Sequence, residues 1–323
     1  MSLHPDQLAF DLKTLTVFLA VAEHGSMTTA AENLSMSQSG VTKIIRRLED
    51  DLGVSLLERS ERPFRPTQAG QELLDQARAL LSQAERLQTS VRELGDAPLP
   101  VVRIGLVDSF AATAGPGLVR SMRSYASNFT VWSGISPNLG DDLVSRKLDF
   151  IISTDPMSSL GGIEYHTVMR EPFLLVMPER MAAAIQEPRL EDLARNHPFV
   201  RYSERSLIGA KIERHLQQAG ISIPESLEFD GTESVFAMVS AGLGWAITTP
   251  LCLIHGFGHL PSLRAMPLPG RSLSRTLYLV ARESRSATLP ARIASDARSI
   301  AQKLVDDKIR PIAPWAADEI VVG

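Results

Sequence analysis

The feature that most limits how this chain can fold is a change of periodicity at GDAPLP, residues 95–100. Before this Gly/Pro-rich linker the apolar residues follow helical spacing, whereas after it short apolar runs typical of strands alternate with helical segments. A chain of 323 residues has room for about two or three domains. The sequence therefore predicts an α/β protein with a mostly α-helical N-terminal part and a domain boundary at this linker.

Composition excludes several classes of protein. Hydrophobic residues make up 44% of the chain and charged residues 22%, the balance of a globular protein with a buried core. The single cysteine, Cys252, excludes an internal disulfide, and no apolar run approaches the roughly 18 residues of a membrane span. Because the N-terminus MSLHPDQLAF lacks the basic and apolar regions of a secretory signal, a cytoplasmic protein with no membrane partner is expected.

Three helices are expected in the N-terminal part. Residues 12–24 carry apolar side chains at helical spacing, Ser26 can cap a short helix over about 28–34, and Ser37 can cap a third helix that ends at Gly53. Because only three or four residues join the last two helices, their spacing is that of a helix-turn-helix. The following run VSLLERSERPFRPT contains two prolines that discourage a helix, so a two-stranded wing is expected there.

The third helix carries groups suited to contacting DNA in the major groove. Gln38 can pair with adenine through two hydrogen bonds, and Ser39 and Thr42 are short enough to approach bases or phosphates. Lys43 and Arg46 can contact phosphate or guanine, while arginines of the wing could reach the flanking minor groove. The net charge of −4 gives no hint of nucleic acid, so a solvated helix in an unrelated bundle is the alternative. The predicted DNA-binding residues are Ser37, Gln38, Ser39, Thr42, Lys43, Arg46, Arg62 and Arg65.

From Thr67 onward the apolar residues recur at alternating steps of four and three. This period of about 3.5 residues keeps one seam facing a partner helix, which predicts a linker and dimerisation helix over residues 67–94. A surface helix packed on its own domain is the alternative. The predicted dimerisation residues are Leu73, Ala77, Leu80, Ala84, Leu87 and Val91.

Beyond the linker, the alternating strands and helices predict parallel sheets covered by helices. About 220 residues is large for one such sheet, so two lobes with a cleft between them are expected. Helical patterns occur around 115–125, 207–219, 232–241 and 289–306. Candidate strands are 101–107, 129–132, 149–153, 164–169, 173–177, 198–202, 227–230, 245–249 and 276–282.

Residues 15–74 closely resemble the winged helix-turn-helix of the LysR-type transcriptional regulators. The matching motifs are FLAVAEHGS, AAENL, SQSGVTKIIRRLE, LGVSLLER and RPTQAG, at fixed spacing. The resemblance extends more loosely to about residue 306, with AGLGWAITTP at 241–250 as the best later match. It implies a coiled-coil dimerisation helix, then a two-lobed effector domain like that of type 2 periplasmic binding proteins, in a homodimer or homotetramer that binds double-stranded DNA.

Three positions depart from the family pattern. Ser39 and Gly40 stand where the family usually has proline and alanine. Arg146 stands where the family has a glycine, in the turn before the third strand of the effector domain. The combined interpretation places the winged helix-turn-helix at 1–66, the linker helix at 67–94, lobe one at 100–167 and 270–306, lobe two at 168–269, and a tail without a recognisable motif at 307–323.

By this resemblance a small-molecule effector lies between the lobes. Hydroxyl groups at helix N-termini together with one cation form an anion site, so a small carboxylate is the expected effector. As alternatives, Ser109 and Thr232 only cap helices, Arg201 is a salt-bridge partner, and Tyr202 is part of a core. The predicted effector-binding residues are Ser109, Phe110, Thr154, Arg201, Tyr202, Ser203 and Thr232.

No pattern in the sequence resembles a nucleophile elbow, a phosphate loop or a metal motif, so no catalytic residue, cofactor or metal is expected. His255 and His259 are four residues apart, but no cysteine or acid adjoins them at ligand spacing. Cys252 lies in an apolar run and is interpreted as an inert buried thiol. The sequence thus favours an effector-responsive transcriptional regulator. Its rivals are a small-molecule binding protein with an N-terminal dimerisation module, and an enzyme on an α/β scaffold.

Overall fold

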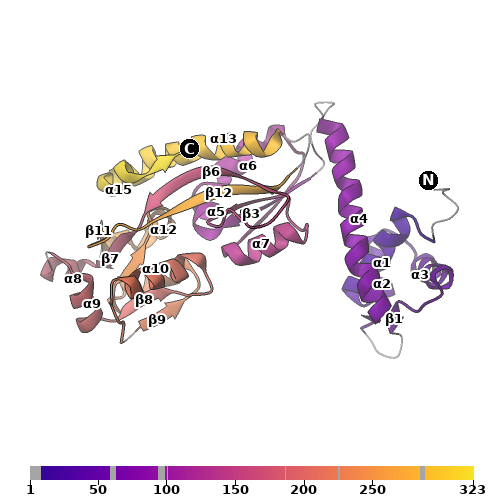
Figure 1. Cartoon of the computed structure of the whole chain (residues 1–323), viewed down its shortest axis with the longest axis horizontal. Helices are drawn as coiled ribbons and strands as arrows, with labels where there is room; N and C mark the ends of the chain where they lie inside the picture. The colour runs from indigo at the N-terminus through magenta and orange to yellow at the C-terminus, as the bar shows by residue number, and fades with distance from the viewer. Residues whose placement is uncertain are drawn as a thin grey trace. The chain divides into compact units, whose positions relative to one another are not determined.

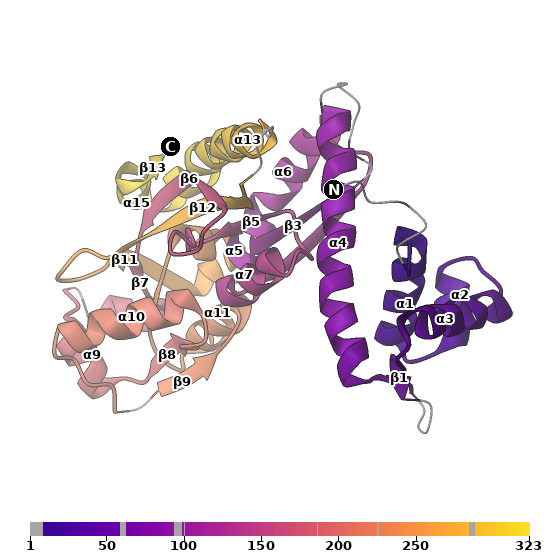
Figure 2. The ribbon, with the colours of Figure 1, turned by 45° about the vertical axis from the view of Figure 1, so that its right-hand side comes forward.

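The chain divides into two compact units, Met1–Asp96 and Ala97–Gly323 (Figures 1 and 2). The first unit has one main hydrophobic core, and the second has a core in each of its two lobes. None of the helices among the described residues is long and apolar enough to cross a membrane. The computed structural model describes residues 9–58, 63–93, 99, 101–185, 187–224, 226–283 and 288–323.

The first unit begins with three short helices, α1 (Leu12–His24), α2 (Met27–Asn33) and α3 (Gln38–Leu52). Each begins at a capping side chain whose oxygen accepts a hydrogen bond from a backbone amide of the first turn; the caps are Asp11, Ser26 and Ser37. The helices α1 and α3 end at Gly25 and Gly53, which have φ values of 61° and 69°. The expected positions and ends of these three helices are therefore confirmed to within about a residue.

A two-stranded wing follows, with β1 (Leu57–Glu58) antiparallel to β2 (Arg65–Pro66). It leads into α4 (Gln68–Glu93), whose N-terminus lies close against the wing. A Cβ atom at Gly70 would lie 2.0 Å from the carbonyl oxygen of Leu56, so only glycine fits at this crossing. Residues 59–62, including the predicted DNA contact Arg62, lie outside the described part of the chain.

The expected seam of α4 divides into two parts. Its first positions pack on the α1–α3 core, since Leu73 is half-buried against that core and Ala77 is buried. Further along, Leu80 and Leu87 are 42% and 67% exposed, so their apolar surface has no cover within the described chain. Ala84 is half-buried, and the side chain of Val91 lies outside the described part.

Lobe one of the second unit is built on a six-stranded sheet in the order β13-β6-β12-β5-β3-β4. Helix α13 packs on β6 and β12, and α7 packs on β3 and β5. Two further helices, α5 and α6, follow β3. The elements are β3 (Val102–Val107), α5 (Asp108–Thr113), α6 (Gly115–Ser121), β4 (Phe129–Gly134), α7 (Ser136–Val144), β5 (Phe150–Ser153), β6 (Ile163–Pro172), β12 (Ser274–Arg282), α13 (Leu289–Leu304) and β13 (Val321–Val322).

Lobe two contains a three-stranded sheet, β10-β7-β11, and a two-stranded sheet, β8-β9, joined by a bridge between Phe199 and Trp245. Its core is separate from that of lobe one. The elements are β7 (Leu174–Pro178), α8 (Glu179–Ala184), α9 (Leu190–Asn196), β8 (Phe199–Tyr202), α10 (Leu207–Gln218), β9 (Ser226–Phe229), α11 (Thr232–Ser240), β10 (Ala246–Thr248), α12 (Pro250–His255) and β11 (Leu263–Pro267).

The expectation of parallel sheets is only partly correct. Strand β3 is parallel to β4 and β5, and β8 is parallel to β9. However, β12 is antiparallel to β5 and β6, and β7 is antiparallel to β10 and β11. The physical reason for the β6–β12 pair is that β6 leads the chain from lobe one to lobe two and β12 leads it back, so the two hinge strands run in opposite directions.

The C-terminal tail is part of the folded domain and contacts both lobes. After α13 the chain forms a π-helical turn (Val305–Ile309), α14 (Arg310–Ile312) and α15 (Pro314–Glu319). Ala313 and Ala316 are buried in the core of lobe two, whereas Ile320 and Val322 pack against the core of lobe one. Strand β13 then pairs with β6, so the tail spans the hinge.

The turn before β5 has a left-handed residue, Arg146, at the position where the resemblance leads one to expect glycine. Arg146 has a φ of 65°, and the amides of Arg146 and Lys147 donate to the carbonyls of Leu143 and Asp142 at 3.2 and 2.9 Å. These two hydrogen bonds form a Schellman motif at the end of α7, in which the left-handed residue is usually glycine.

We expect Arg146→Gly to raise the free energy of unfolding by about 1 kcal/mol, because a left-handed conformation costs a side-chain-bearing residue about 1–2 kcal/mol and glycine returns part of this as chain entropy. Urea unfolding followed by tryptophan fluorescence measures the change. The control is Ser145→Gly, since Ser145 has a φ of −75° and glycine should there destabilise the helix end. Equal effects of the two substitutions would contradict the argument.

Candidate functional site

Helix α3 buries one face and presents the other to solvent. Val41, Ile45 and Leu48 lie in the core of the first unit, which fixes the rotation of the helix. The side chains of Gln38, Ser39, Lys43 and Arg46 are exposed on the opposite side. The half-buried Thr42 donates its hydroxyl to the carbonyl of Gln38 at 2.9 Å, and Ser37 caps the helix.

Two of the three acidic groups at the end of α3, Glu49 and Asp51, form side-chain contacts within the domain. Glu49 Oε1 accepts hydrogen bonds from the amides of Leu56 and Leu57, at 2.8 and 3.3 Å, and thereby joins α3 to the wing. Arg47 pairs with Asp51 at 3.5 Å. In the part of the chain that the structure describes, no acidic side chain pairs with Lys43 or Arg46, and Arg65 is exposed on β2. The exposed face of α3 therefore carries an amide, a hydroxyl and two cations whose charges are not offset by such a pair.

The second unit has a pocket of about 430 Å³, counting space open to solvent, between lobe one and lobe two. Its walls come from the ends of β3, β4 and β5 in lobe one, from the first turns of α10 and α11 in lobe two, and from β12 at the hinge. Ligands of open α/β sheets bind at such strand ends. The lining residues are Val107, Asp108, Ser109, Gly134, Ile135, Ser136, Thr154, Tyr202, Ser206, Leu207, Ile208, Asp230, Thr232, Cys252 and Arg275.

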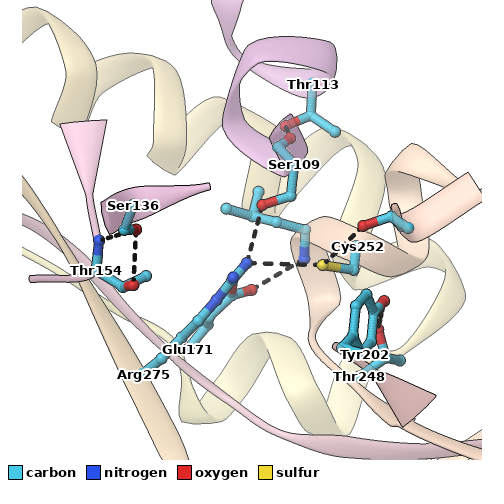
Figure 3. Close-up of polar contacts among 11 residues, drawn as sticks. Ser109, Thr113, Ser136, Thr154, Glu171, Tyr202, Thr248, Cys252 and Arg275 are labelled. Atoms are coloured by element: carbon cyan, nitrogen blue, oxygen red, sulfur yellow. Dashed lines mark hydrogen bonds and ion pairs between the residues drawn. The ribbon is translucent and has the colours of Figure 1, made fainter. Parts of the chain in front are cut away.

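One lining residue, Arg275, belongs to a buried ion pair (Figure 3). Glu171 on β6 and Arg275 on β12 are directly opposite each other in the strand register, and their side chains are 0% and 6% exposed. Arg275 Nε donates to Glu171 Oε1 at 2.7 Å, and Nη2 lies 2.7 Å from the same oxygen in the ion pair. Nη2 also donates to Ser109 Oγ at 3.0 Å. The other carboxylate oxygen accepts from the amide of Leu251 at 2.9 Å. One charged pair thus connects both hinge strands with α5 of lobe one and α12 of lobe two.

Several hydroxyl groups of the pocket walls form hydrogen bonds that join neighbouring elements (Figure 3). Ser136 Oγ lies 3.1 Å from Thr154 Oγ1 and accepts from the amide of Thr154, so α7 and β5 are held together. Tyr202 shares a hydrogen bond of 2.9 Å with Thr248, and burial raises its pKa well above the ordinary value, so the phenol stays protonated. Thr232 donates to the sulfur of Cys252 at 3.6 Å.

Four helices that contribute residues to the pocket begin without a side-chain cap, and they are α5, α7, α11 and α12. The two longest of them are α7, which begins at Ser136 in lobe one, and α11, which begins at Thr232 in lobe two. The first amides of a helix point outward along its axis, and the helix dipole favours negative charge at that end. The pocket therefore offers anion-binding amides from both lobes.

Four of the seven predicted effector-binding residues line the pocket, namely Ser109, Thr154, Tyr202 and Thr232. Neither Ser109 nor Thr232 is an N-cap: Ser109 accepts from Arg275, and the N-cap of α11 is Gly231.

The other three predicted residues are placed elsewhere. Phe110 is fully buried in the core of lobe one, and Ser203 accepts hydrogen bonds from Arg205. Arg201 forms an ion pair with Glu213, as the salt-bridge alternative predicted. Successive side chains of a strand point to opposite faces, so on β8 Arg201 points away from the side on which Tyr202 lines the pocket. The cation that lines the pocket is Arg275 instead.

Sequence reasoning missed Glu171 and Arg275 as well as Asp108, Ser136 and Ser206. Ser136 and Ser206 do have a local signal, since each lies at the start of a helical segment that follows a strand. Of the two histidines that the sequence analysis considered and did not assign to a metal, His259 bonds to Glu233 at 2.7 Å and to Ser240 at 3.2 Å. The described residues contain no group of three or more His, Cys, Asp or Glu arranged to hold a metal ion.

Both units match known protein families. Residues 12–71 match the model "Bacterial regulatory helix-turn-helix protein, lysR family", and residues 95–297 match "LysR substrate binding domain". The HTH-type transcriptional regulator YofA of Bacillus subtilis (strain 168) is 29% identical over 260 residues, which cover 79% of this chain and 86% of YofA.

Solved structures are similar over most of the chain. Full-length OxyR from Pseudomonas aeruginosa gives a TM-score of 0.64 at 22% identity and covers 94% of this chain and 96% of its own. Full-length CbnR in complex with its target DNA gives 0.62 at 22% identity, covering 90% and 100%. These similarities confirm the predicted fold class, a helix-turn-helix followed by a two-lobed α/β domain.

Proposed function

Since the chain belongs to the LysR family of bacterial transcriptional regulators, we propose that α3 contacts an operator sequence in DNA and that a small carboxylate in the interlobe pocket acts as the effector. The protein is a DNA-binding transcriptional regulator with an effector-binding domain, and not an enzyme. The alternative of a small-molecule binding protein with a dimerisation module is not favoured, because the helix-turn-helix model matches residues 12–71. As a protein that acts on genomic DNA, it is proposed to work in the cytoplasm.

The exposed face of α3 supports the DNA-contacting role. Gln38 presents an amide that can bond to the N6 and N7 positions of adenine. Lys43 and Arg46 are exposed on the same helix and can contact phosphates. Arg65 of the wing is exposed and free to reach a flanking groove. We include Ser37, Ser39, Thr42 and Arg62 in the proposed contact surface.

The carboxylate proposal rests on one observation: the uncapped N-termini of α7 and α11 reach the same pocket from opposite lobes. A carboxylate bonded to both would hold the lobes together, so it would favour one closure of the lobes over others. Arg275 is less available to such a ligand, because its guanidinium already forms an ion pair with Glu171. Asp108 and Asp230 also line the pocket and would accept a hydroxyl or ammonium group of the same ligand.

We propose a homodimer or homotetramer in which the exposed part of the α4 seam meets its copy. Leu80 and Leu87 expose apolar side chains that a second helix would cover. Dimerisation would also place two copies of α3 on successive half-sites of the DNA.

We expect Thr232→Val to reduce the stabilisation that small carboxylates give to the full-length protein, because the variant loses the hydroxyl at the start of α11 but keeps its volume and its backbone amides. A thermal-shift panel would compare small carboxylic acids, including hydroxy and amino acids, with their uncharged amides. The matched control is Ser234→Ala, which removes an exposed hydroxyl from the same turn. If the amides stabilise the wild type as well as the acids do, the effector is not recognised as an anion and the carboxylate proposal fails.

A further inference from the structure

The C-terminal part of the chain forms a third connection between the two lobes, in addition to the hinge strands β6 and β12. After α13 it continues through the π-helical turn, α14 and α15 to β13. Residues 305–322 are here called the strap. Its side chains contribute to the core of lobe two, to the packing on the core of lobe one and to a smaller apolar cluster of its own.

The first attachment of the strap is to lobe two. Ala313 and Ala316 are fully buried in the core of that lobe. The larger side chain of Trp315 packs against the same core from the residue between them along α15. The start of α15 is therefore held by lobe two, although the strap follows a helix of lobe one in the sequence.

The strap also contacts an element that forms part of the pocket wall. Val305 and Ile309 are buried against each other, and Ile254 of α12 packs against them. The same helix α12 carries Cys252, which lines the interlobe pocket. A movement of α12 relative to lobe one would therefore disturb the contacts of the strap.

The second attachment of the strap is to lobe one, beside the hinge. Ile320 and Val322 pack against the core of lobe one. In the pairing of β13 with β6, Val322 lies opposite Met169, and the amide of Gly323 donates to the carbonyl of Val168 at 3.1 Å. The hinge strand β6 is thus flanked by β12 on one side and by β13 on the other (Figure 2).

The segment between the two attachments is short. Ala316 and Ile320 are four residues apart, and most of this segment belongs to α15. A chain of four residues spans at most about 14 Å when fully extended, and about 6 Å as a helix. At this point the lobes can therefore separate widely only if α15 unwinds or if one attachment is lost.

We propose that the strap restricts the interlobe pocket to a narrow range of openings, so that an effector selects within this range instead of driving a wide hinge closure. A hinge of two strands by itself permits two lobes to rotate around a ligand. A third connection that is fastened to both lobes removes much of this freedom. A pocket restricted in this way loses less conformational entropy on binding, and it favours ligands that fit the preset opening.

The test measures the distance between the lobes of the full-length protein without an effector. Spin labels are attached to Asp141→Cys on α7 and to Gln218→Cys on α10, which are both exposed, whereas the native Cys252 is buried. Labelled chains are diluted with unlabelled chains, so that pulsed dipolar spectroscopy reports distances within one chain. The wild type should give one narrow distance distribution.

We expect Val322→Asp to broaden this distribution and to add a population outside the wild-type range, because a carboxylate is unfavourable in the apolar contact with lobe one. The matched control Val321→Asp adds the same charge to the same strand at a side chain that is 58% exposed, and its distribution should equal that of the wild type. Trp315→Ala loosens the attachment to lobe two and should broaden the distribution as well.

A segment that only stabilised the domain would give a different result. The variants would then unfold at a lower temperature, but the folded protein would keep the wild-type distance distribution, and this outcome overturns the proposal. If Val322→Asp does not fold, Val322→Ala must broaden the distribution relative to Val321→Ala, and equal distributions of these two would also overturn it. Because no ligand is added, the result is independent of the carboxylate proposal.

Discussion

Replacing Glu171 with glutamine is expected to lower the free energy of unfolding of the effector domain by about 3–5 kcal/mol. The substitution keeps the shape of the side chain but leaves the guanidinium of Arg275 buried without a counter-charge. Burial of an unpaired charge is among the largest single-residue costs in proteins, whereas an intact pair offsets most of it. Urea unfolding measures the loss, and tryptophan fluorescence is a specific reporter because Trp132, Trp245 and Trp315 all lie in this domain.

The matched control is Glu179→Gln, which removes one partner of the exposed ion pair with Arg264 and should have a far smaller effect. The double variant Glu171→Gln with Arg275→Gln tests the pair itself. Its loss of stability should be smaller than the sum of the two single losses, because neither charge is left alone. Additive losses, or a Glu171 effect no larger than that of Glu179, would show that the pair does not carry the expected energy.

The same pair has a consequence for regulation, because it lies where both hinge strands meet both lobes. Arg275 contacts Ser109 of lobe one, and Glu171 accepts from the first turn of α12 in lobe two. A change in lobe closure must therefore either preserve these contacts or break them together. Buried charge pairs of this kind can specify one arrangement over others, and we expect the Glu171 variant to sample lobe arrangements that the wild type excludes.

The N-terminal helices could be predicted from the sequence because local chemistry marks their boundaries. Ser26 and Ser37 are caps, Gly25 and Gly53 end helices, and the apolar stripe of α3 has one period throughout. Strands with strong apolar runs could likewise be predicted from the sequence. In contrast, β11 was missed: the segment LRAMP has little strand signal, and it is held in place by pairing along its whole length with β7. The structure of the C-terminal tail could not be predicted for the same reason, because it depends on packing against both lobes.

The candidate site could be predicted only where a hydroxyl residue follows a strand, as for Ser109, Thr154 and Thr232. The Glu171–Arg275 pair could not be predicted, because its members are 104 residues apart and charged residues are normally expected at the surface. The one local hint is an acid within the run VMREPFLLVM. Arg201 illustrates the opposite error, since strand alternation turns it away from the pocket toward Glu213.

The second large effect is expected at the exposed amide of α3. Gln38→Ala should weaken binding to a specific operator by about 1–3 kcal/mol, or about 5- to 150-fold, because a bidentate contact to adenine is lost. The operator for this measurement is a duplex selected from a random pool by the wild-type protein, and affinity is measured by fluorescence anisotropy at fixed salt. Binding to an unrelated duplex should stay nearly unchanged, since a base contact contributes to specificity rather than to general attraction for phosphate.

Two further variants separate base recognition from general attraction to DNA. Lys43→Met should weaken binding to the selected and the unrelated duplex alike and should reduce the dependence of affinity on salt, as expected for a phosphate contact. Gln76→Ala removes an exposed glutamine from α4 and should leave both affinities unchanged. Because Gln38 is exposed in the first turn of α3, its loss should not disturb the buried stripe of Val41, Ile45 and Leu48. Operator affinity equal to that of the Gln76 variant would therefore remove Gln38 from the DNA contact without any ambiguity from misfolding.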